Sequence, residues 1–419
     1  MFARRTPLPR PLLALFTAGY LAPYLLPTVV GRLESGLPLT ATEAGAVGSA
    51  LLLSSASAGF LLASRVERIG ARTLARTGLA LAALGYGGAA LAGDVPAVVA
   101  GAILGGFGSG TATTVAATRI AAEPDPHRTS TLGLLWVSAV AGVVYLTVPH
   151  LGAGHGQPLA AIALASLAVW PLTGRLPGRT ASAARRRERA ALPHLRAGLV
   201  LAAAMPCWSL VQNSLWGVSG RIGLTQAGLS EAAVGAVFAV ALGAGLMGVL
   251  GARALGARLG RAVPIGAGTV LIAGCVVASA SATGPVSFTT GEIAWNVLYP
   301  VVLSYLIGLA ASLDPRGRWA VLVGAAGSLG TAAGPLTGSV LSAWAGFPVM
   351  GLVLGAALLV VAVPMTGVAL HAGGRLVLTG AVRQPAVELI EVDVPAVSAP
   401  DAYDTAGPRQ AGASPGSGN

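Results

Sequence analysis

One acidic side chain lies within a long apolar part of the sequence. Glu292 separates the charge-free interval 262–291 from the interval 293–313. Apolar surroundings disfavour the charged form of a carboxyl group, so an acid that alternates between water and a buried cavity is suited to carry a proton. We expect Glu292 to couple proton movement to function or to contact a substrate, either inside a cavity or at the outer end of its helix.

Aromatic and amide side chains recur at helical spacing in several apolar segments. Trp208, Gln212 and Trp216 are four residues apart and share one helix face. Polar groups inside hydrocarbon need a wet cavity or a neighbouring helix, so this pattern predicts a cavity that binds a small organic molecule. The residues predicted to contact that molecule are Tyr24, Thr28, Trp136, Trp208, Gln212, Asn213, Trp216, Trp295, Asn296 and Tyr299.

Two of the polar patterns have a second interpretation. Thr111, Thr114 and Thr118 form a stripe whose hydroxyls can line a cavity or bond to their own helix backbone. Aromatic residues near span ends, such as Tyr20 and Trp344, often belong to interfacial belts.

The remaining chemistry is sparse. The 26 basic residues are all arginine, which excludes a P-loop ATPase, a Schiff-base enzyme and a retinal protein. Two cysteines, Cys207 and Cys275, give no thiolate metal cluster. A membrane enzyme would need paired acids or a His-based constellation inside the spans, and His150 and His155 fall in an outer turn. We expect no enzyme activity, no cofactor and no metal site.

The composition defines the protein class. Apolar residues make up 54% of the chain and charged residues 10%, with a mean hydropathy of +0.75. A soluble domain carries about 25% charged residues because its surface faces water. The sequence therefore predicts an all-α integral membrane protein.

Charge-free intervals measure the membrane spans, because a helix needs about 20 apolar residues to cross a bilayer. Two of the ten intervals are long enough for two helices, and each has a Gly/Pro break, at 150–158 and at 344–348. This gives twelve predicted transmembrane helices. The intervals are 11–31, 44–64, 77–93, 95–118, 129–174, 197–220, 232–252, 262–291, 293–313 and 319–374.

Arginine placement predicts the orientation. With a cytoplasmic N-terminus, all arginines except Arg32 and Arg221 fall on the cytoplasmic side, as the positive-inside rule requires. Both termini are then cytoplasmic, and we expect a multi-pass protein of the cell membrane. The net charge of +11 needs no nucleic acid, although the run 185–189 could also form a patch for RNA or anionic lipid.

The two halves of the chain share short segments in the same order, at offsets of 187 to 190 residues. Six plus six spans with a cytoplasmic linker are typical of parallel-repeat transporters. The matching segments are Val47-Gly48 with Val234-Gly235, Arg68-Ile69-Gly70 with Arg258-Leu259-Gly260, and Asp125-Pro126 with Asp314-Pro315. The predicted parts are a cytoplasmic N-terminus (1–10), a six-helix bundle (11–174), an arginine-rich linker (175–196), a second six-helix bundle (197–370) and a disordered cytoplasmic tail (371–419).

The segment from Gly59 to Arg72 resembles the loop 2–3 signature of the major facilitator superfamily (MFS). Glu67, Arg68, Gly70 and Arg72 occupy its acidic, basic and glycine positions, although Ala63 replaces its first glycine. The pattern Gly330-x-x-x-Gly334-Pro335-x-x-Gly338 also resembles a recurrent pattern of the superfamily. Span four lacks the arginine of many proton-coupled members, and span five lacks the Gly-Pro signature of exporters.

The resemblance implies two six-helix bundles related by a pseudo-two-fold axis. It also implies a gate in which Glu67 faces the start of span eleven near Trp319 while the cytoplasmic side is closed. We therefore expect a secondary active transporter that moves a small amphiphilic molecule, uncharged or cationic, by alternating access. Its partners would be that substrate, membrane lipid and protons, without ATP or nucleic acid. Efflux by proton antiport is the favoured interpretation, with proton-linked nutrient uptake as the alternative; a passive channel and a membrane enzyme are disfavoured.

Overall fold

The computed structural model describes residues 9–176, 192–255, 259–314 and 316–373, and helices are the only regular elements in those ranges. Most of the predicted linker and nearly all of the predicted tail lie outside the described residues. The first half contains α1 (Arg10–Tyr24), α2 (Leu26–Gly36), α3 (Ala41–Leu62), α4 (Val66–Ile69), α5 (Ala71–Leu91), α6 (Val95–Ile120), α7 (Pro126–Thr147) and α8 (Gly156–Val169). The second half contains α9 (Leu195–Arg221), α10 (Glu231–Leu255), α11 (Ala262–Ala280), α12 (Pro285–Ser312) and α13 (Arg318–Gly373).

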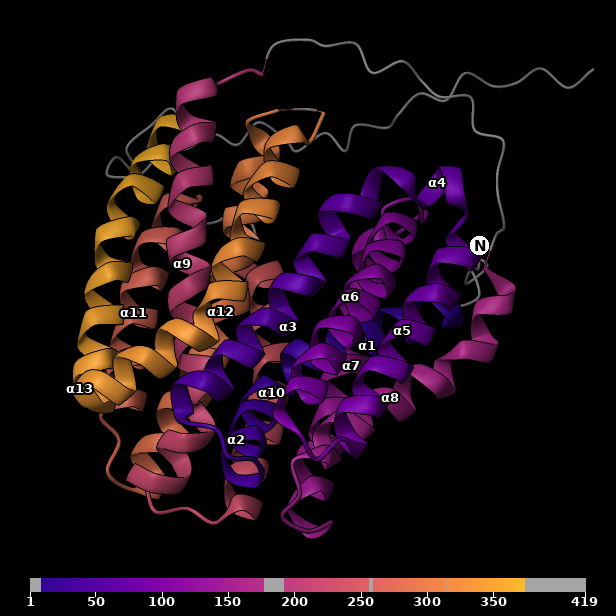
Figure 1. Ribbon diagram of the computed structural model, residues 1–419. Helices are drawn as coiled ribbons and strands as arrows, with labels where there is room; N and C mark the ends of the chain where they lie inside the picture. Colours follow the sequence, from indigo (N-terminus) through magenta and orange to yellow (C-terminus); the bar gives the residue numbers. More distant parts are fainter. Residues whose placement is uncertain (1–8, 177–191, 256–258, 315, 374–419) are drawn as a thin grey trace, which may run out of the picture. The chain divides into compact units, whose positions relative to one another are not determined.

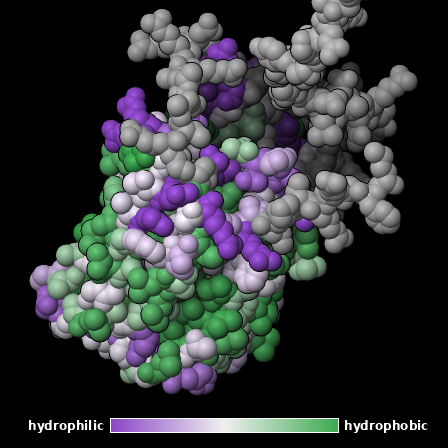
Figure 2. Space-filling view, turned by 90° about the vertical axis from the view of Figure 1, so that its right-hand side faces the viewer, coloured by the Kyte–Doolittle hydropathy of each residue, from purple (hydrophilic) through white to green (hydrophobic). Residues whose placement is uncertain are grey.

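The helices are built to cross a membrane. Ten helical segments are long and apolar enough for a span, and the pair α1 and α2, bent by 49°, adds an eleventh. Large apolar side chains such as Leu91 and Val286 are exposed. The lower part of the face in Figure 2 is mostly hydrophobic, and hydrophilic residues gather above it. Such a surface needs lipid around it. The protein is an all-α multi-pass membrane protein.

One element differs in detail from its charge-free interval, and one predicted break is present. The first predicted span, 11–31, continues to Gly36 and bends at Leu25. The predicted break at 344–348 is present inside α13, where Gly346 has the non-helical angles φ 78° and ψ 166°. Glycine adopts a positive φ at little cost, which explains why the chain turns at this residue.

The two halves of the chain form two groups of helices (Figure 1). Contacts between the groups run from α3 to α13, from α7 to α10 and from α2 to α9. The second predicted span of each half therefore packs against the fifth predicted span of the other half. The repeat seen in the sequence thus corresponds to a repeated mode of contact.

The repeated loop segments do the same structural work in both halves. Asp125 accepts a hydrogen bond from the backbone N–H of Arg128 (2.9 Å) at the start of α7. Asp314 accepts one from the Arg318 Nε (2.6 Å) at the start of α13. The Arg318 hydrogen bond, the largest cause, also holds the pKa of the Asp314 carboxyl below its usual value. Gly70 and Gly260, the paired glycines, have φ angles of 104° and 63°.

The glycine pattern of α13 brings that helix against α9. A Cβ atom at Gly330 would overlap the Pro206 carbonyl oxygen, and one at Gly338 would overlap the Ser214 carbonyl oxygen. Small residues in this pattern allow two backbones to approach closely, which is how membrane helices associate without a hydrophobic driving force between them.

We predict that Gly330→Ala destabilises the protein by about 1–3 kcal/mol, because the added methyl group overpacks the α9–α13 contact. Gly324→Ala is the matched control on the same helix, since nothing lies within 4 Å of its Cβ position. Apparent melting temperatures in detergent compare the two variants. Equal melting temperatures would contradict the close contact.

Candidate functional site

A cavity of about 680 Å³ lies between the two groups of helices. Its walls come from α1, α3, α6 and α7 of the first half and from α9, α10, α12 and α13 of the second. It extends from Gln212 and Trp216 to His127, an exposed residue at the start of α7. We call this end of the helices the basic end, because its described connections carry arginines such as Arg68, Arg119 and Arg128. The cavity therefore reaches solvent at the basic end.

Aromatic rings form the inner wall of the cavity. Trp295 lies between Trp216 and Tyr299, with ring centroids 5.7 Å and 5.9 Å away. Tyr299 in turn stacks on Trp208 at 5.3 Å and an interplanar angle of 15°. The Trp216 Nε1 donates a hydrogen bond to the Pro23 carbonyl of the other half (3.1 Å). The rings thus present a continuous apolar surface with a fixed orientation.

Three amide side chains accompany these rings. The Gln212 Oε1 accepts a hydrogen bond from the Trp295 Nε1 (2.5 Å). The Asn213 Nδ2 donates to the Ser209 carbonyl (2.9 Å), and the Asn296 Nδ2 donates to the Glu292 carbonyl (3.0 Å). The Asn213 Nδ2 also donates to the Thr331 hydroxyl (3.3 Å). Each amide is thus engaged through one of its two polar atoms, and the other polar atom is available for a ligand.

Seven of the ten predicted substrate-contacting residues line this cavity. They come from α1, α9 and α12, which are distant in the sequence. They are Tyr24, Gln212, Asn213, Trp216, Trp295, Asn296 and Tyr299.

The other three lie elsewhere. Trp208 is fully buried and supports Tyr299 from behind. Thr28 follows the bend between α1 and α2 into a second pocket at the opposite end. Trp136 is 53% exposed on the outer surface. It cannot share the cavity face with Leu134 and Ser138, because a shift of two residues turns about halfway around a helix.

The threonine hydroxyls of α6 bond to the backbone of their own helix, which is the second of the two interpretations of this stripe. Thr111, Thr114 and Thr118 each donate a hydrogen bond to the carbonyl four residues earlier, at 2.7 to 2.8 Å. These hydroxyls serve their own helix, although Thr114 also borders the cavity.

Glu292 occupies neither of its two expected places. It is fully buried between α9, α11 and α12 and is not one of the residues that line the cavity. Its Oε1 accepts a hydrogen bond from the Ser219 hydroxyl (3.0 Å), and its Oε2 has no partner among the described residues. Trp295 and Asn296 follow it one helical turn along α12. The carboxyl group thus lies behind the cavity wall, inside the second group of helices.

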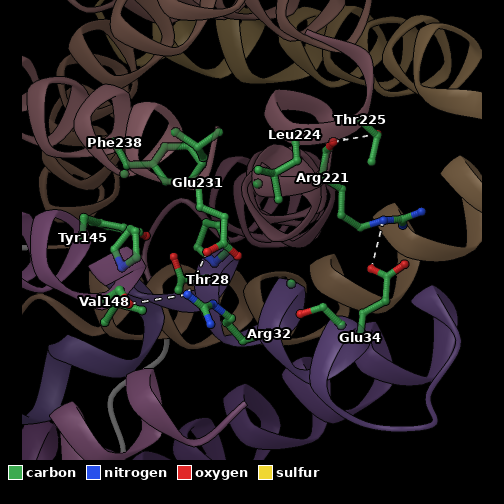
Figure 3. Close-up of a pocket in the computed structure, with 17 residues that line it drawn as sticks. Thr28, Arg32, Glu34, Tyr145, Val148, Arg221, Leu224, Thr225, Glu231 and Phe238 are labelled. Carbon is green, nitrogen blue, oxygen red and sulfur yellow. Dashed lines mark hydrogen bonds and ion pairs between the residues drawn. The ribbon is translucent and has the colours of Figure 1, made fainter. Parts of the chain in front are cut away.

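The end opposite the basic end is closed by two ion pairs between the halves (Figure 3). Arg32 of α2 binds Glu231 of α10 at 2.9 Å. Arg221 of α9 binds Glu34 of α2 at 3.0 Å. We call these four residues the barrier. They line a pocket of about 400 Å³, separate from the cavity in its lining residues.

Close backbone contacts reinforce the barrier. A Cβ at Gly235 would overlap the Tyr145 carbonyl oxygen, and one at Gly45 would overlap the Ser339 hydroxyl. The Leu336 N–H donates a hydrogen bond to the Ser49 hydroxyl across the halves (2.9 Å). The halves therefore touch at this end, while the cavity separates them toward the basic end.

The loop 2–3 signature lies at the basic end. Gly70 ends α4 with a positive φ, and the Arg72 Nε donates to the Leu176 carbonyl (2.9 Å). Glu67 and Arg68 are exposed. Trp319 is buried against α9 and donates to the Pro193 carbonyl (2.7 Å). The gate contact predicted between Glu67 and this helix start stays a prediction.

The sequence did not single out the barrier, although it carried a signal for it. Arg32 and Arg221 were the two arginines that the predicted topology placed on the non-cytoplasmic side, against the positive-inside rule. They are 189 residues apart, within the offset of the repeat. Two misplaced charges at equivalent positions indicate a shared role, and the acids that pair with them follow on neighbouring segments.

No family model matches the sequence, and no curated protein matches it. Solved structures do match. They include a D-xylose–proton symporter (17% identity, 85% of this chain and 95% of that chain, TM-score 0.67) and the human organic anion transporter MFSD10, or TETRAN (17%, 86% and 100%, 0.65). A mutant of the nucleoside transporter NupG is similar to the same degree (14%, 86% and 100%, 0.67). The chain has the fold of major facilitator superfamily transporters. In this MFS fold the cavity lies between the halves and the barrier closes one end.

We predict that Arg32→Glu opens the barrier, because it places a second carboxylate beside Glu231. The rate at which an impermeant maleimide modifies Thr28→Cys, with Cys207 and Cys275 replaced by alanine, should rise about tenfold or more. The double variant Arg32→Glu with Glu231→Arg should recover part of the protection. Arg221→Glu is the matched comparison and should have a smaller effect, since the Arg221 side chain is 20% exposed against 4% for Arg32. Unchanged labelling in Arg32→Glu would contradict the role of the barrier.

Proposed function

We propose that this protein is a secondary active transporter that works by alternating access. The observation that supports this most is the asymmetry between the two ends. The cavity reaches solvent at His127, while two ion pairs join the halves at the opposite end. A carrier needs a cavity that is open to one side at a time, and rupture of a few polar contacts is a change that a two-state element can make.

The proposal includes twelve membrane spans with both termini in the cytoplasm. It counts α1 with α2 as one span and divides α13 at Gly346. The basic end is then cytoplasmic by the positive-inside rule, and the barrier faces outward. Cell-membrane localisation is part of the same proposal.

The substrate in this proposal is a small amphiphilic organic molecule. Aromatic faces and neutral amides from α1, α9 and α12 would contact it. Paired acid–base groups, which a membrane enzyme would need, do not occur among the described residues that line the cavity; His127 is its one titratable side chain besides tyrosines. This favours transport without chemistry.

We further propose that Glu292 carries the coupling proton. A buried carboxyl group with a hydroxyl partner and no cation beside it among the described residues is costly to ionise in place. It would lose its proton only when a conformational change brings it to water. Export by proton antiport is our first assignment of direction.

Uptake by proton symport is the second candidate. It is favoured by the similarity to a D-xylose–proton symporter, a protein whose cargo and proton move together. The two candidates differ in the sign of proton movement when a compound is transported. At the basic end, Glu67, Arg68, Gly70 and Arg72 would form the gate that closes when the barrier opens.

Alternating access predicts opposite distance changes at the two ends. Spin labels at Ser35 and Thr225 would report the barrier end, and labels at Ala122 and Ala311 the basic end; all four residues are exposed. Double electron–electron resonance in nanodiscs should show two populations, in which the first distance is long when the second is short. Arg32→Glu should shift both pairs in opposite directions. A change at one end alone would contradict the proposal.

Proton coupling predicts that these populations depend on pH. The structure described here buries Glu292, so raising the pH should favour the state in which the carboxylate meets water, with the barrier open. Glu292→Gln should abolish this dependence and keep both populations. Glu123→Gln, a change in the α6–α7 connection away from the cavity lining, is the matched control. The same pH response in wild type and Glu292→Gln would exclude Glu292 as the proton carrier.

A further inference from the structure

The inner part of the cavity is lined by neutral polar and aromatic side chains. Its described lining residues carry no acid, no arginine and no lysine there, and His127 lies at the solvent end. Transfer of an ion from water into such a site without a counter-charge is costly. The wall therefore favours a ligand without net charge.

One buried donor in this wall has no acceptor. The Gln212 side chain is 1% exposed, and its Oε1 is engaged by the Trp295 Nε1, which fixes the amide orientation. Its Nε2 has no hydrogen-bond partner among the described residues. A buried N–H group without a partner destabilises the protein, so a ligand that supplies an acceptor removes this cost.

Hydrogen-bond acceptors line the same cavity as that donor. The Asn213 and Asn296 amides use their Nδ2 groups on helix carbonyls, which leaves the Oδ1 atoms as acceptors at the cavity wall. A ligand that satisfies the wall must therefore offer both an acceptor, for Gln212, and N–H or O–H donors, for the asparagines.

The rings complete the description. Trp216, Trp295 and Tyr299 present adjacent aromatic surfaces to the same region. Such faces pack well against a flat unsaturated ring, in stacked or tilted arrangements. The flat apolar part of a ligand and its polar edge would thus have separate places in the cavity.

We propose that the cavity binds an uncharged, planar molecule whose polar edge is of the carboxamide type, with a carbonyl beside an N–H group, and that Gln212 selects it. This assignment rests on the proposed transport function and narrows its substrate class. The carbonyl accepts from the Gln212 Nε2, the N–H donates to an asparagine Oδ1, and the ring packs on the tryptophan and tyrosine surface.

Three compounds of nearly equal shape test the proposal. 2-Naphthamide is neutral and has both an acceptor and donors; 2-naphthamidine is cationic and lacks the acceptor; 2-naphthoate is anionic and lacks the donors. Isothermal titration calorimetry with the full chain in nanodiscs should give an affinity for 2-naphthamide about tenfold or more above the other two. Equal or tighter binding of either ion, or no binding of any of the three, would overturn the proposal.

Two substitutions test the selecting residue. Gln212→Glu keeps an acceptor for the Trp295 Nε1 and replaces the donor with an acidic group, so the preference should move to 2-naphthamidine. Gln212→Met removes the donor without adding charge, and 2-naphthamide should bind about tenfold more weakly with no gain for the ions. Ala122→Glu adds the same carboxylate at an exposed residue of the α6–α7 connection, outside the cavity lining, and is the control that should behave as wild type.

An unchanged order of affinities in Gln212→Glu would show that Gln212 does not select the ligand. That result is distinguishable from failure of the transport proposal, because the distance measurements at the two ends need no ligand. Opposite distance changes with the wrong ligand order would reject the substrate class alone.

Discussion

The closed end of this protein depends on a buried guanidinium group. The Arg32 side chain is 4% exposed, and a charge at that depth must be paired and hydrogen-bonded. It donates to the Gly152 carbonyl (2.5 Å) within its own half and to the Glu231 carboxylate (2.9 Å) of the other half. Glu231 is 45% exposed on its side chain, so water is close to the partner. Such a pair stabilises the conformation in which this end is closed. Because water can replace the partner, the pair can break at a modest cost in free energy.

Helix α9 connects the three functional regions. Gln212 binds Trp295 at the cavity wall, Ser219 binds Glu292 in the bundle interior, and Arg221 binds Glu34 at the barrier. These three α9 residues lie within three turns of one rigid helix. A displacement of α9 relative to α2 would therefore act on the ligand, the carboxyl group and the barrier together. This arrangement would give the proposed proton coupling a physical route without placing the acid in the cavity.

The sequence predicted the positions of the helices better than the contacts that their residues make with other helices. The span positions and the break at Gly346 followed from charge spacing and backbone preferences, which are local properties. Periodicity also grouped Gln212 with Trp216 correctly, but it cannot say which face of a helix points inward, and Trp136 was therefore misplaced. The first predicted span ended before Arg32 because the spans were bounded by charged residues. An acid from the other half pairs with this arginine, and the sequence does not reveal such a distant partner. The depth of Glu292 was likewise set by neighbouring helices, through Ser219.

The most direct test of alternating access measures one cavity position from both sides. Asn213→Cys, in a protein with Cys207 and Cys275 replaced by alanine, would be labelled with an impermeant maleimide in vesicles of known orientation. The account predicts rapid labelling from the basic side only, and a gain of labelling from the opposite side with a matching loss from the basic side when Arg32→Glu is added. Equal labelling from both sides at once, as in an open pore, would contradict it.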